Sequence, residues 1–306
     1  MILLRYVEKI NEMAQLDPET MVREAESRYH ERLETIAVKI FDNEKKRIVM
    51  LAGPSASGKT TSAKLISDKL ERLGAKAFIV SLDDFYKNQS QAVIDENGNP
   101  DFETVHALDI DLIHRCFDDI ISRGATELPV FDFIKGERIE KNRYISLDKD
   151  DVIIVEGIHA LNPLITQALP SENLMKLYVS VSSRITDEND EVIMSKRDLR
   201  FVRRLVRDYH HRASSVERTY ELWRSVLKGE DKYIFPFSHM ADERIDSIHA
   251  YEPCVFRSLA IPMLESVEAS SEYYTDARRM IERLELFVPL DTSVIPKTSL
   301  LNEFLA

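Results

Sequence analysis

Short apolar runs alternate with longer segments of helical periodicity along the middle of this chain. The runs typical of buried strands are Ile48–Ala52 and residues 76–81, 152–155 and 174–181. Between them, apolar residues recur every three or four positions, over residues 61–73 and 109–122, which is the period of an α-helix. Buried strands that alternate with helices predict an α/β fold with a mainly parallel sheet flanked by helices.

The first fifty residues predict a long helix. Asp17 can cap it, Pro18 suits its first turn, and Glu19 complements the helix dipole, with helical spacing continuing to Phe41. Because this segment precedes the first strand, we expect residues 1–46 to form an N-terminal helical accessory that packs on the main domain.

The remaining pattern divides the chain into smaller pieces. Gly74 and Gly124 are placed to end helices, and residues 95–101 are rich in turn formers. Broken apolar spacing over residues 128–147 predicts a small antiparallel insertion. Residues 197–228 predict two helices joined near residues 213–215, and helical spacing returns over 251–286. We therefore expect one main domain over residues 47–286 and a proline-interrupted tail over 287–306.

A phosphate-binding motif follows the first strand. Residues 53–60 read Gly-Pro-Ser-Ala-Ser-Gly-Lys-Thr, between an apolar run and a helix. Two glycines let backbone N–H groups approach phosphates, Lys59 can reach the outer phosphates, and the Thr60 hydroxyl can bind Mg²⁺. The predicted nucleotide-binding residues are Gly53, Pro54, Ser55, Ala56, Ser57, Gly58, Lys59, Thr60 and Thr61, and the fold class becomes a P-loop NTPase type. A glycine-containing turn that matches by chance is the alternative.

Composition narrows the class of partner. The chain has 306 residues, of which 44% are apolar, and a formal net charge of −12. A net acidic chain argues against nucleic acid or anionic membrane as the main partner. No apolar stretch has the length of a membrane span and no signal peptide is evident, so we expect a cytoplasmic location. Cys116 and Cys254 are expected to be free thiols in helices.

Two acidic residues follow predicted strands at the edge where ligands of parallel sheets bind. Asp83 comes after the second strand and Glu156 ends the third. We predict that Asp83 orients an attacking hydroxyl, accepts its proton and contacts Mg²⁺ through water, while Glu156 holds the metal shell. The alternative for either residue is a helix cap or a solvated turn.

Arginines recur at helical spacing over residues 197–212, at Arg197, Arg200, Arg203, Arg204, Arg207 and Arg212. In a kinase such a face can close over a triphosphate and stabilise charge during phosphoryl transfer. The alternative is a solvated helix that carries surface charge. His210 and His211 lack a partner at metal-ligand spacing and are expected on the helix surface.

Together these motifs resemble the uridine kinase and phosphoribulokinase family of P-loop kinases. The resemblance spans about residues 47–228 and is carried by the phosphate loop, residues 83–86 (Asp-Asp-Phe-Tyr), 129–133 (Pro-Val-Phe-Asp-Phe), 156–157 (Glu-Gly) and 203–208 (Arg-Arg-Leu-Val-Arg-Asp). The tail over residues 296–304 is similar to a bacterial uridine-kinase-related branch.

The resemblance implies ATP and Mg²⁺ as cofactors and phosphorylation of a small-molecule alcohol, typically the 5′-hydroxyl of a pyrimidine ribonucleoside. It implies catalytic roles for Asp83, Lys59 and Arg207. The residues that it places around the acceptor are Asp83, Tyr86, Glu103, Phe131, Phe133, Arg204 and Arg212.

The chain also departs from the family pattern. Glu103 stands where uridine kinases place an aspartate on the ribose, Gly136 where they place a base-contacting histidine, and Ala213 with Ser214 where a further arginine is expected. Pockets that read a base by hydrogen bonds need such partners. The alternatives left open are a kinase of another ribose-like or sugar alcohol, and a nucleotide-binding regulatory module without an acceptor. Homo-oligomerisation is also left open.

Overall fold

The centre of the molecule is a parallel sheet of five strands. The computed structural model describes residues 5–43, 45, 47–94, 98, 100–133, 135–139 and 143–305. All four strand pairings within this sheet are parallel. The strands, in their spatial order, are β11 (Glu243–Asp246), β8 (Leu174–Ser180), β1 (Ile48–Ala52), β7 (Val152–Glu156) and β2 (Ala77–Ser81). The expected α/β architecture with a mainly parallel sheet is confirmed.

Both faces of the sheet are covered, which explains why its central strands are apolar throughout. In β1, Val49 and Leu51 belong to one core cluster, whereas Met50 and Ala52 belong to the other. Successive side chains of a strand point to opposite faces, so a strand between two layers of helices needs apolar residues at every position.

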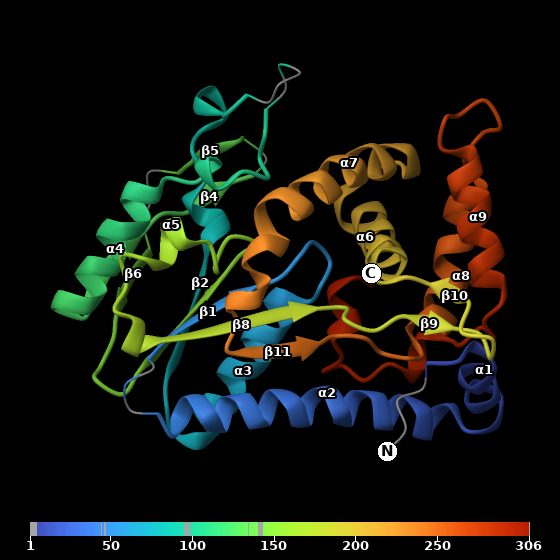
Figure 1. Ribbon diagram of the computed structural model, residues 1–306, viewed down its shortest axis with the longest axis horizontal. Coiled ribbons are helices and arrows are strands. Elements are labelled where there is room, and N and C mark those ends of the chain that lie inside the picture. The colour runs from blue at the N-terminus through green and yellow to red at the C-terminus, as the bar shows by residue number, and fades with distance from the viewer. Residues whose placement is uncertain are drawn as a thin grey trace.

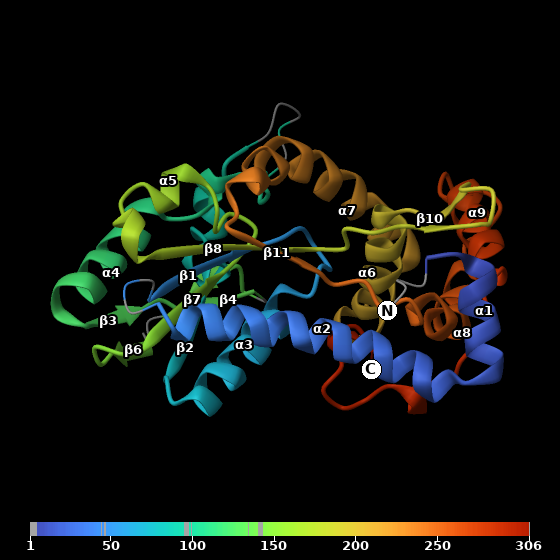
Figure 2. The same cartoon turned by 60° about the horizontal axis from the view of Figure 1, so that its bottom comes forward.

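Helices form the two covering layers (Figures 1 and 2). One core cluster joins the sheet to α1 (Val7–Leu16), α2 (Pro18–Phe41), α3 (Lys59–Leu73), α6 (Lys196–Arg212), α7 (Val216–Gly229), α8 (Glu252–Glu265) and α9 (Tyr274–Glu285). The other face carries α4 (Ile110–Arg123) and α5 (Pro163–Thr166). Figure 1 shows α2 lying along the long axis at the bottom of the view, while α6 and α7 lie in its upper right part.

The helix signals of the N-terminal segment are confirmed, and a second helix was missed. Asp17 caps α2 by accepting a hydrogen bond from the Thr20 amide at 3.0 Å. The preceding helix α1 was not predicted. Leu33, Ile36 and Ile40 of α2 are fully buried in the core that it shares with α3. The proposed domain boundaries at residues 46 and 286 stay a prediction, but α2 and the sheet have one core.

The expected antiparallel insertion is present as two small pairs. β3 (Ala125–Leu128) pairs with β6 (Arg143–Ser146), and β4 (Phe131–Asp132) with β5 (Glu137–Arg138). Residues 134 and 140–142 of this insertion, and residues 95–97 and 99 of the turn-rich stretch, lie outside the described residues. A further pair, β9 (Ile185–Thr186) with β10 (Val192–Met194), precedes α6 and was not predicted.

Several local expectations are confirmed. Gly74 and Gly124 end their helices in the left-handed conformation, with φ of +100° and +68°. The arginine-rich region forms α6 and α7, joined at Ala213, and Cys116 and Cys254 are free and buried in helices. Within the described ranges, we find no helix with the length and apolar character that crossing a bilayer requires.

The C-terminal segment after α9 packs back onto the core. It contains two short 3₁₀ turns, Thr292–Val294 and Leu300–Glu303. Leu300, Leu301 and Phe304 are fully buried. His211 at the end of α6 lies 3.0 Å from the carbonyl oxygen of Leu305. The end of the chain is therefore held against α6, as Figure 1 shows.

Candidate nucleotide and acceptor site

The phosphate-binding loop connects β1 to α3 and is shaped by its glycines. A Cβ atom on Gly53 would lie 2.1 Å from the carbonyl oxygen of Val179, so no larger residue fits there. Gly58 has a φ of +84°, which favours glycine. The loop wraps the first turn of α3, and the Lys59 ammonium donates to the Pro54 carbonyl oxygen at 3.2 Å. The nine predicted nucleotide-binding residues thus form one continuous segment that runs into the N-terminal turn of α3, and a helix N-terminus favours anions.

The two predicted acidic residues lie beside this loop because β2 and β7 are neighbours. Ser81, the last residue of β2, is paired in register with Glu156, the last residue of β7. The Ser81 hydroxyl donates to Glu156 at 3.0 Å and accepts from the Asp83 amide at 3.3 Å. One serine therefore fixes the relative positions of Glu156 and of the backbone that carries Asp83.

Burial raises the pKa of both carboxyl groups above the ordinary values, and Lys59 opposes this increase in each case. Asp83 further raises the pKa of Glu156 through repulsion between the two charges. Both acids therefore lie in the field of the Lys59 ammonium. Oxygen ligands at Thr60, Asp83 and Glu156 are of the type that Mg²⁺ prefers. A divalent cation would also relieve the repulsion between the two carboxylates, so this residue set fits the metal.

The three arginines assigned to the lid or acceptor gather on one buried carboxylate. Asp208, which is 1% exposed, forms ion pairs with Arg204 at 3.0 Å, Arg207 at 2.9 Å and Arg212 at 3.4 Å. Arg204 also donates to the Ser55 hydroxyl of the phosphate loop at 2.9 Å. Arg212 lowers the pKa of Asp83, so its charge acts on the proposed base. The structure therefore places Arg204 next to the loop and Arg212 near Asp83, and Asp208 links Arg207 to both.

For two other arginines of α6, neither predicted role applies: they do not close over the triphosphate site, and they do not lie on a solvated surface. Arg200 and Arg203 are neither solvated nor poised above the site, since they are 2% and 0% exposed. Arg200 pairs with the buried Glu230 at 2.6 Å, and Arg203 pairs with the buried Glu252 at 2.6 Å. Arg200 and Arg203 can be buried because two glutamates from later in the chain neutralise their charges.

These buried pairs hold the phosphate loop from behind. Arg200 donates to the Ser55 carbonyl oxygen at 3.0 Å, while Glu230 accepts from the Ser55 amide at 3.1 Å. Arg203 lies 3.4 Å from the Ala56 carbonyl oxygen. Ala56 has a φ of +56°, which is unusual for a residue with a Cβ. The paired side chains thus contact the backbone of the loop at Ser55 and at Ala56, the loop residue with a Cβ and a positive φ.

Three of the predicted acceptor residues, Tyr86, Phe131 and Phe133, form an aromatic shelf near Asp83. The rings of Tyr86 and Phe131 are 5.9 Å apart, and those of Phe131 and Phe133 meet edge to face at 5.1 Å. Phe133 is 64% exposed, so this end of the shelf is open. Burial raises the pKa of Glu103 to about 7, and Arg204 is the strongest opposing charge. An open aromatic surface beside a carboxyl group can hold a flat ring and a hydroxyl-bearing group.

The departure at Gly136 has a structural reason. Gly136 closes the turn between β4 and β5 with a φ of +67°, and an added Cβ would lie 2.8 Å from the Gln89 side-chain oxygen. The carbonyl oxygen of Gly136 accepts a hydrogen bond from the backbone N–H of Gln89 at 2.8 Å. A histidine at position 136 would be strained and would displace Gln89.

Several residues of this region were not predicted from the sequence. His159 is 2% exposed and lies next to the backbone of Glu103, and burial lowers the imidazole pKa to about 4. Only its position three residues after Glu156 could have drawn attention to it. Glu230 and Glu252 gave no local signal. Glu303 lies in the tail and contacts Thr61 of the phosphate loop.

A family model described as Phosphoribulokinase / Uridine kinase family matches residues 48–252. A uridine kinase of Staphylococcus haemolyticus is 32% identical over 196 residues, covering 64% of this chain and 84% of the relative. A uridine kinase of Macrococcus caseolyticus is 30% identical over 199 residues, covering 65% and 86%.

Among solved structures, a possible uridine kinase from Bacillus stearothermophilus aligns with a TM-score of 0.48 at 17% identity, covering 71% of this chain and 98% of that one. A putative fructose transport system kinase from Silicibacter sp. aligns with the same TM-score at 16% identity, covering 69% and 98%. The family model, which spans most of the chain from β1 to the start of α8, establishes that this protein belongs to the phosphoribulokinase and uridine kinase family.

Proposed function

We propose that the protein is an ATP-dependent kinase that transfers the γ-phosphate to a hydroxyl group of a small molecule, with the 5′-hydroxyl of a uridine-like or cytidine-like nucleoside as its acceptor. The observation that carries this proposal is the placement of Asp83 and Glu156 at the ends of neighbouring strands, within the field of Lys59 at the phosphate loop. Family membership and the uridine kinases among the relatives support the reaction class.

Each residue has a distinct role in this proposal. The loop amides and Lys59 bind the triphosphate, and Thr60, Asp83 and Glu156 would hold Mg²⁺ directly or through water. The metal would neutralise charge between the outer phosphates. Asp83 orients the acceptor hydroxyl and takes its proton, a role that is helped by a pKa that burial raises above the ordinary value. Arg204, Arg207 and Arg212 supply positive charge for the phosphoryl group as it moves.

The acceptor would lie on the aromatic shelf. A nucleobase can stack on Phe131 or Phe133, with Tyr86 behind them, and Glu103 can accept hydrogen bonds from ribose hydroxyls. The neutral imidazole of the buried His159 adds a donor and an acceptor near Glu103. The turn at Gly136 favours a second candidate, a kinase of another ribose-like or sugar alcohol, because it removes the side chain that the family places on the base.

The first experiment tests Asp83. We expect Asp83→Asn to bind ATP with nearly unchanged affinity but to lose phosphoryl transfer by about 10²- to 10⁴-fold, since the amide cannot accept the proton. Calorimetry would measure ATP binding, and acceptor-dependent release of ADP would measure transfer. Asp118→Asn, an exposed position on α4, is the matched control. Near-normal turnover of Asp83→Asn would remove Asp83 from this role.

The second part of the experiment tests the acceptor. Wild-type protein with ATP and Mg²⁺ would be offered pyrimidine and purine nucleosides, free pentoses and polyols. The proposal expects the largest stimulation of ADP release with a pyrimidine nucleoside. Stimulation by a sugar or polyol alone would favour the second candidate. Nucleotide binding without stimulation by any compound would favour a regulatory module.

A further inference from the structure

The last residues of the chain lie against the phosphate loop. The Glu303 carboxylate accepts a hydrogen bond from the Thr61 hydroxyl at 2.6 Å, and the Thr61 amide lies 3.3 Å from the same oxygen. These two groups come from segments 242 residues apart. The contact is therefore made by the tertiary fold and is not a local cap of the helix.

The Thr61 amide is one of the donors that the loop offers to phosphate. Within α3 the Ser62 amide bonds to the Gly58 carbonyl oxygen at 2.9 Å, so Thr61 precedes the first amide that is satisfied inside the helix. In a phosphate loop these free N–H groups and the neighbouring hydroxyl bind the inner phosphates of the nucleotide. The Glu303 carboxylate thus occupies donors that a phosphate would use, and it carries the same sign of charge.

The tail is held firmly in this position by its apolar residues. Leu300 covers Gly58 so closely that a Cβ atom there would lie 2.2 Å from the leucine Cδ1 atom. The guanidinium carbon of Arg203 lies 5.3 Å from the centre of the Phe304 ring. Both side chains are fully buried. The tail therefore rests on the loop at Gly58 and Thr61 and on the buried arginine behind the loop.

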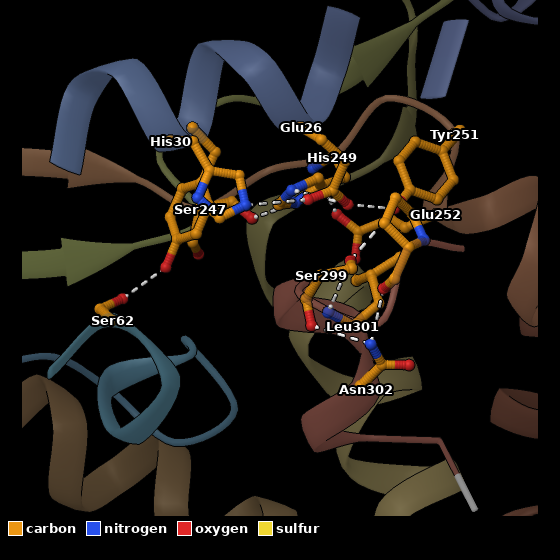
Figure 3. Close-up of polar contacts among 12 residues, drawn as sticks. Glu26, His30, Ser62, Ser247, His249, Tyr251, Glu252, Ser299, Leu301 and Asn302 are labelled. Carbon is orange, nitrogen blue, oxygen red and sulfur yellow. Dashed lines mark hydrogen bonds and ion pairs between the residues drawn. The ribbon is translucent and has the colours of Figure 1, made fainter. Parts of the chain in front are cut away.

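A buried polar network anchors the start of the tail (Figure 3). The Tyr251 hydroxyl donates to Glu26 of α2 and lies 3.2 Å from the Ser299 hydroxyl. Ser299 in turn accepts from the Leu301 amide at 3.1 Å. On the other side of the network, Tyr29 of α2 lies 2.7 Å from Ser62 of α3. The segment 299–305 is thus continuous with the structure that supports the phosphate loop.

We propose that residues 299–305 are a built-in competitor of the nucleotide, in which the Glu303 carboxylate occupies an inner phosphate position and must leave when ATP binds. This inference rests on the proposed function, because it takes the loop as the ATP site. A carboxylate and a phosphate cannot share the Thr61 donors, since their charges repel at this distance. The observed affinity for nucleotide equals the intrinsic affinity multiplied by the fraction of molecules whose tail is undocked.

The test compares ATP binding by wild-type protein, Glu303→Ala and Glu303→Gln. We expect Glu303→Ala to lower the dissociation constant of Mg-ATP about tenfold, as measured by calorimetry, because the docked tail then competes less well. Glu303→Gln keeps an acceptor oxygen without the charge and should lie between the two. Glu282→Gln, which removes one exposed charge from α9, is the matched control and should bind like wild type. Unchanged or weaker binding by Glu303→Ala would overturn the inference.

Hydrogen exchange of the wild-type protein provides a measurement that needs no variant. Saturating Mg-ATP should speed exchange of the amides in residues 300–305, whereas equal or slower exchange would overturn the inference and make the tail part of the bound site. Failure of wild type and Glu303→Ala alike to bind ATP would overturn the proposed function. Binding by both with equal dissociation constants would overturn only the role of the tail.

Discussion

Among single residues, Glu103 couples the acceptor region to pH. Its pKa of about 7 lies above the ordinary value of 4.5 because the carboxyl group is buried. Between these two values the folded protein holds a proton that the unfolded chain has released. The stabilisation contributed by this group is therefore fully present below pH 4.5 and is lost as pH rises through about 7, the pKa of the folded state.

This linkage gives a stability prediction. Glu103→Gln removes the titrating group. We therefore expect the free energy of unfolding of the variant to rise relative to that of wild type from pH 5 to pH 8. Urea denaturation at four pH values across this range would measure the difference. Glu282→Gln on the exposed surface should show a constant difference. A constant difference for Glu103→Gln as well would show that its carboxyl group does not hold the extra proton.

Among the elements, α6 shows best what a helix contributes beyond its own sequence. Arg203 is fully buried against Glu252 and against the Ser247 carbonyl oxygen, which accepts at 2.7 Å. Removing one member of such a pair leaves an uncompensated buried charge. We expect Arg203→Met to lower the free energy of unfolding by about 3–5 kcal/mol. The double variant Arg203→Met/Glu252→Gln should lose less than the sum of the two single variants.

A double-mutant cycle by urea denaturation would measure this coupling. Arg279 and Asp276 form a control pair of the same chemistry on α9, at 2.7 Å and largely exposed. Arg279→Met should cost less than about 1 kcal/mol, because water screens an exposed pair. Additive losses for Arg203 and Glu252 would contradict a buried ion pair.

For α6, the helix itself could be predicted from the sequence, but the partners of its buried arginines could not. The shared face of several arginines of α6 follows from helical periodicity, whereas the capping of its start by Ser195 is seen only in the structure. The partners Glu230 and Glu252 lie 30 and 49 residues away along the chain, so no local pattern links them. The phosphate loop, Asp83 and Glu156 could be predicted because strand ends and a short motif determine their positions. His159 and Glu303 could not, because only tertiary packing brings them to the site.

For the whole molecule, the question is whether the N-terminal helices form a separate unit. Residues 1–46 were expected to be an accessory, on the basis of their place before the first strand. The hydrophobic core extends across the proposed boundary at residue 46. Leu33 of α2 is fully buried in the same cluster as α3, α6 and the C-terminal segment. A hydrophobic cluster that spans these elements should unfold as one cooperative unit.

Leu33→Ala tests this cooperativity with the one tryptophan of the chain as the probe. Trp223 lies on α7, where its ring is 5.9 Å from that of Phe201 of α6, so its fluorescence reports on α6 and α7 rather than on α2. The cavity should lower the free energy of unfolding by about 2–5 kcal/mol, and the tryptophan signal and helical circular dichroism should shift together. Leu16→Ala, at a 76% exposed position, is the control and should leave both transitions in place. If Leu33→Ala left the tryptophan transition unchanged but shifted the loss of helical circular dichroism to lower urea, α2 would unfold by itself. Coincident shifts would mean that the segment before β1 is part of the domain that carries the phosphate loop.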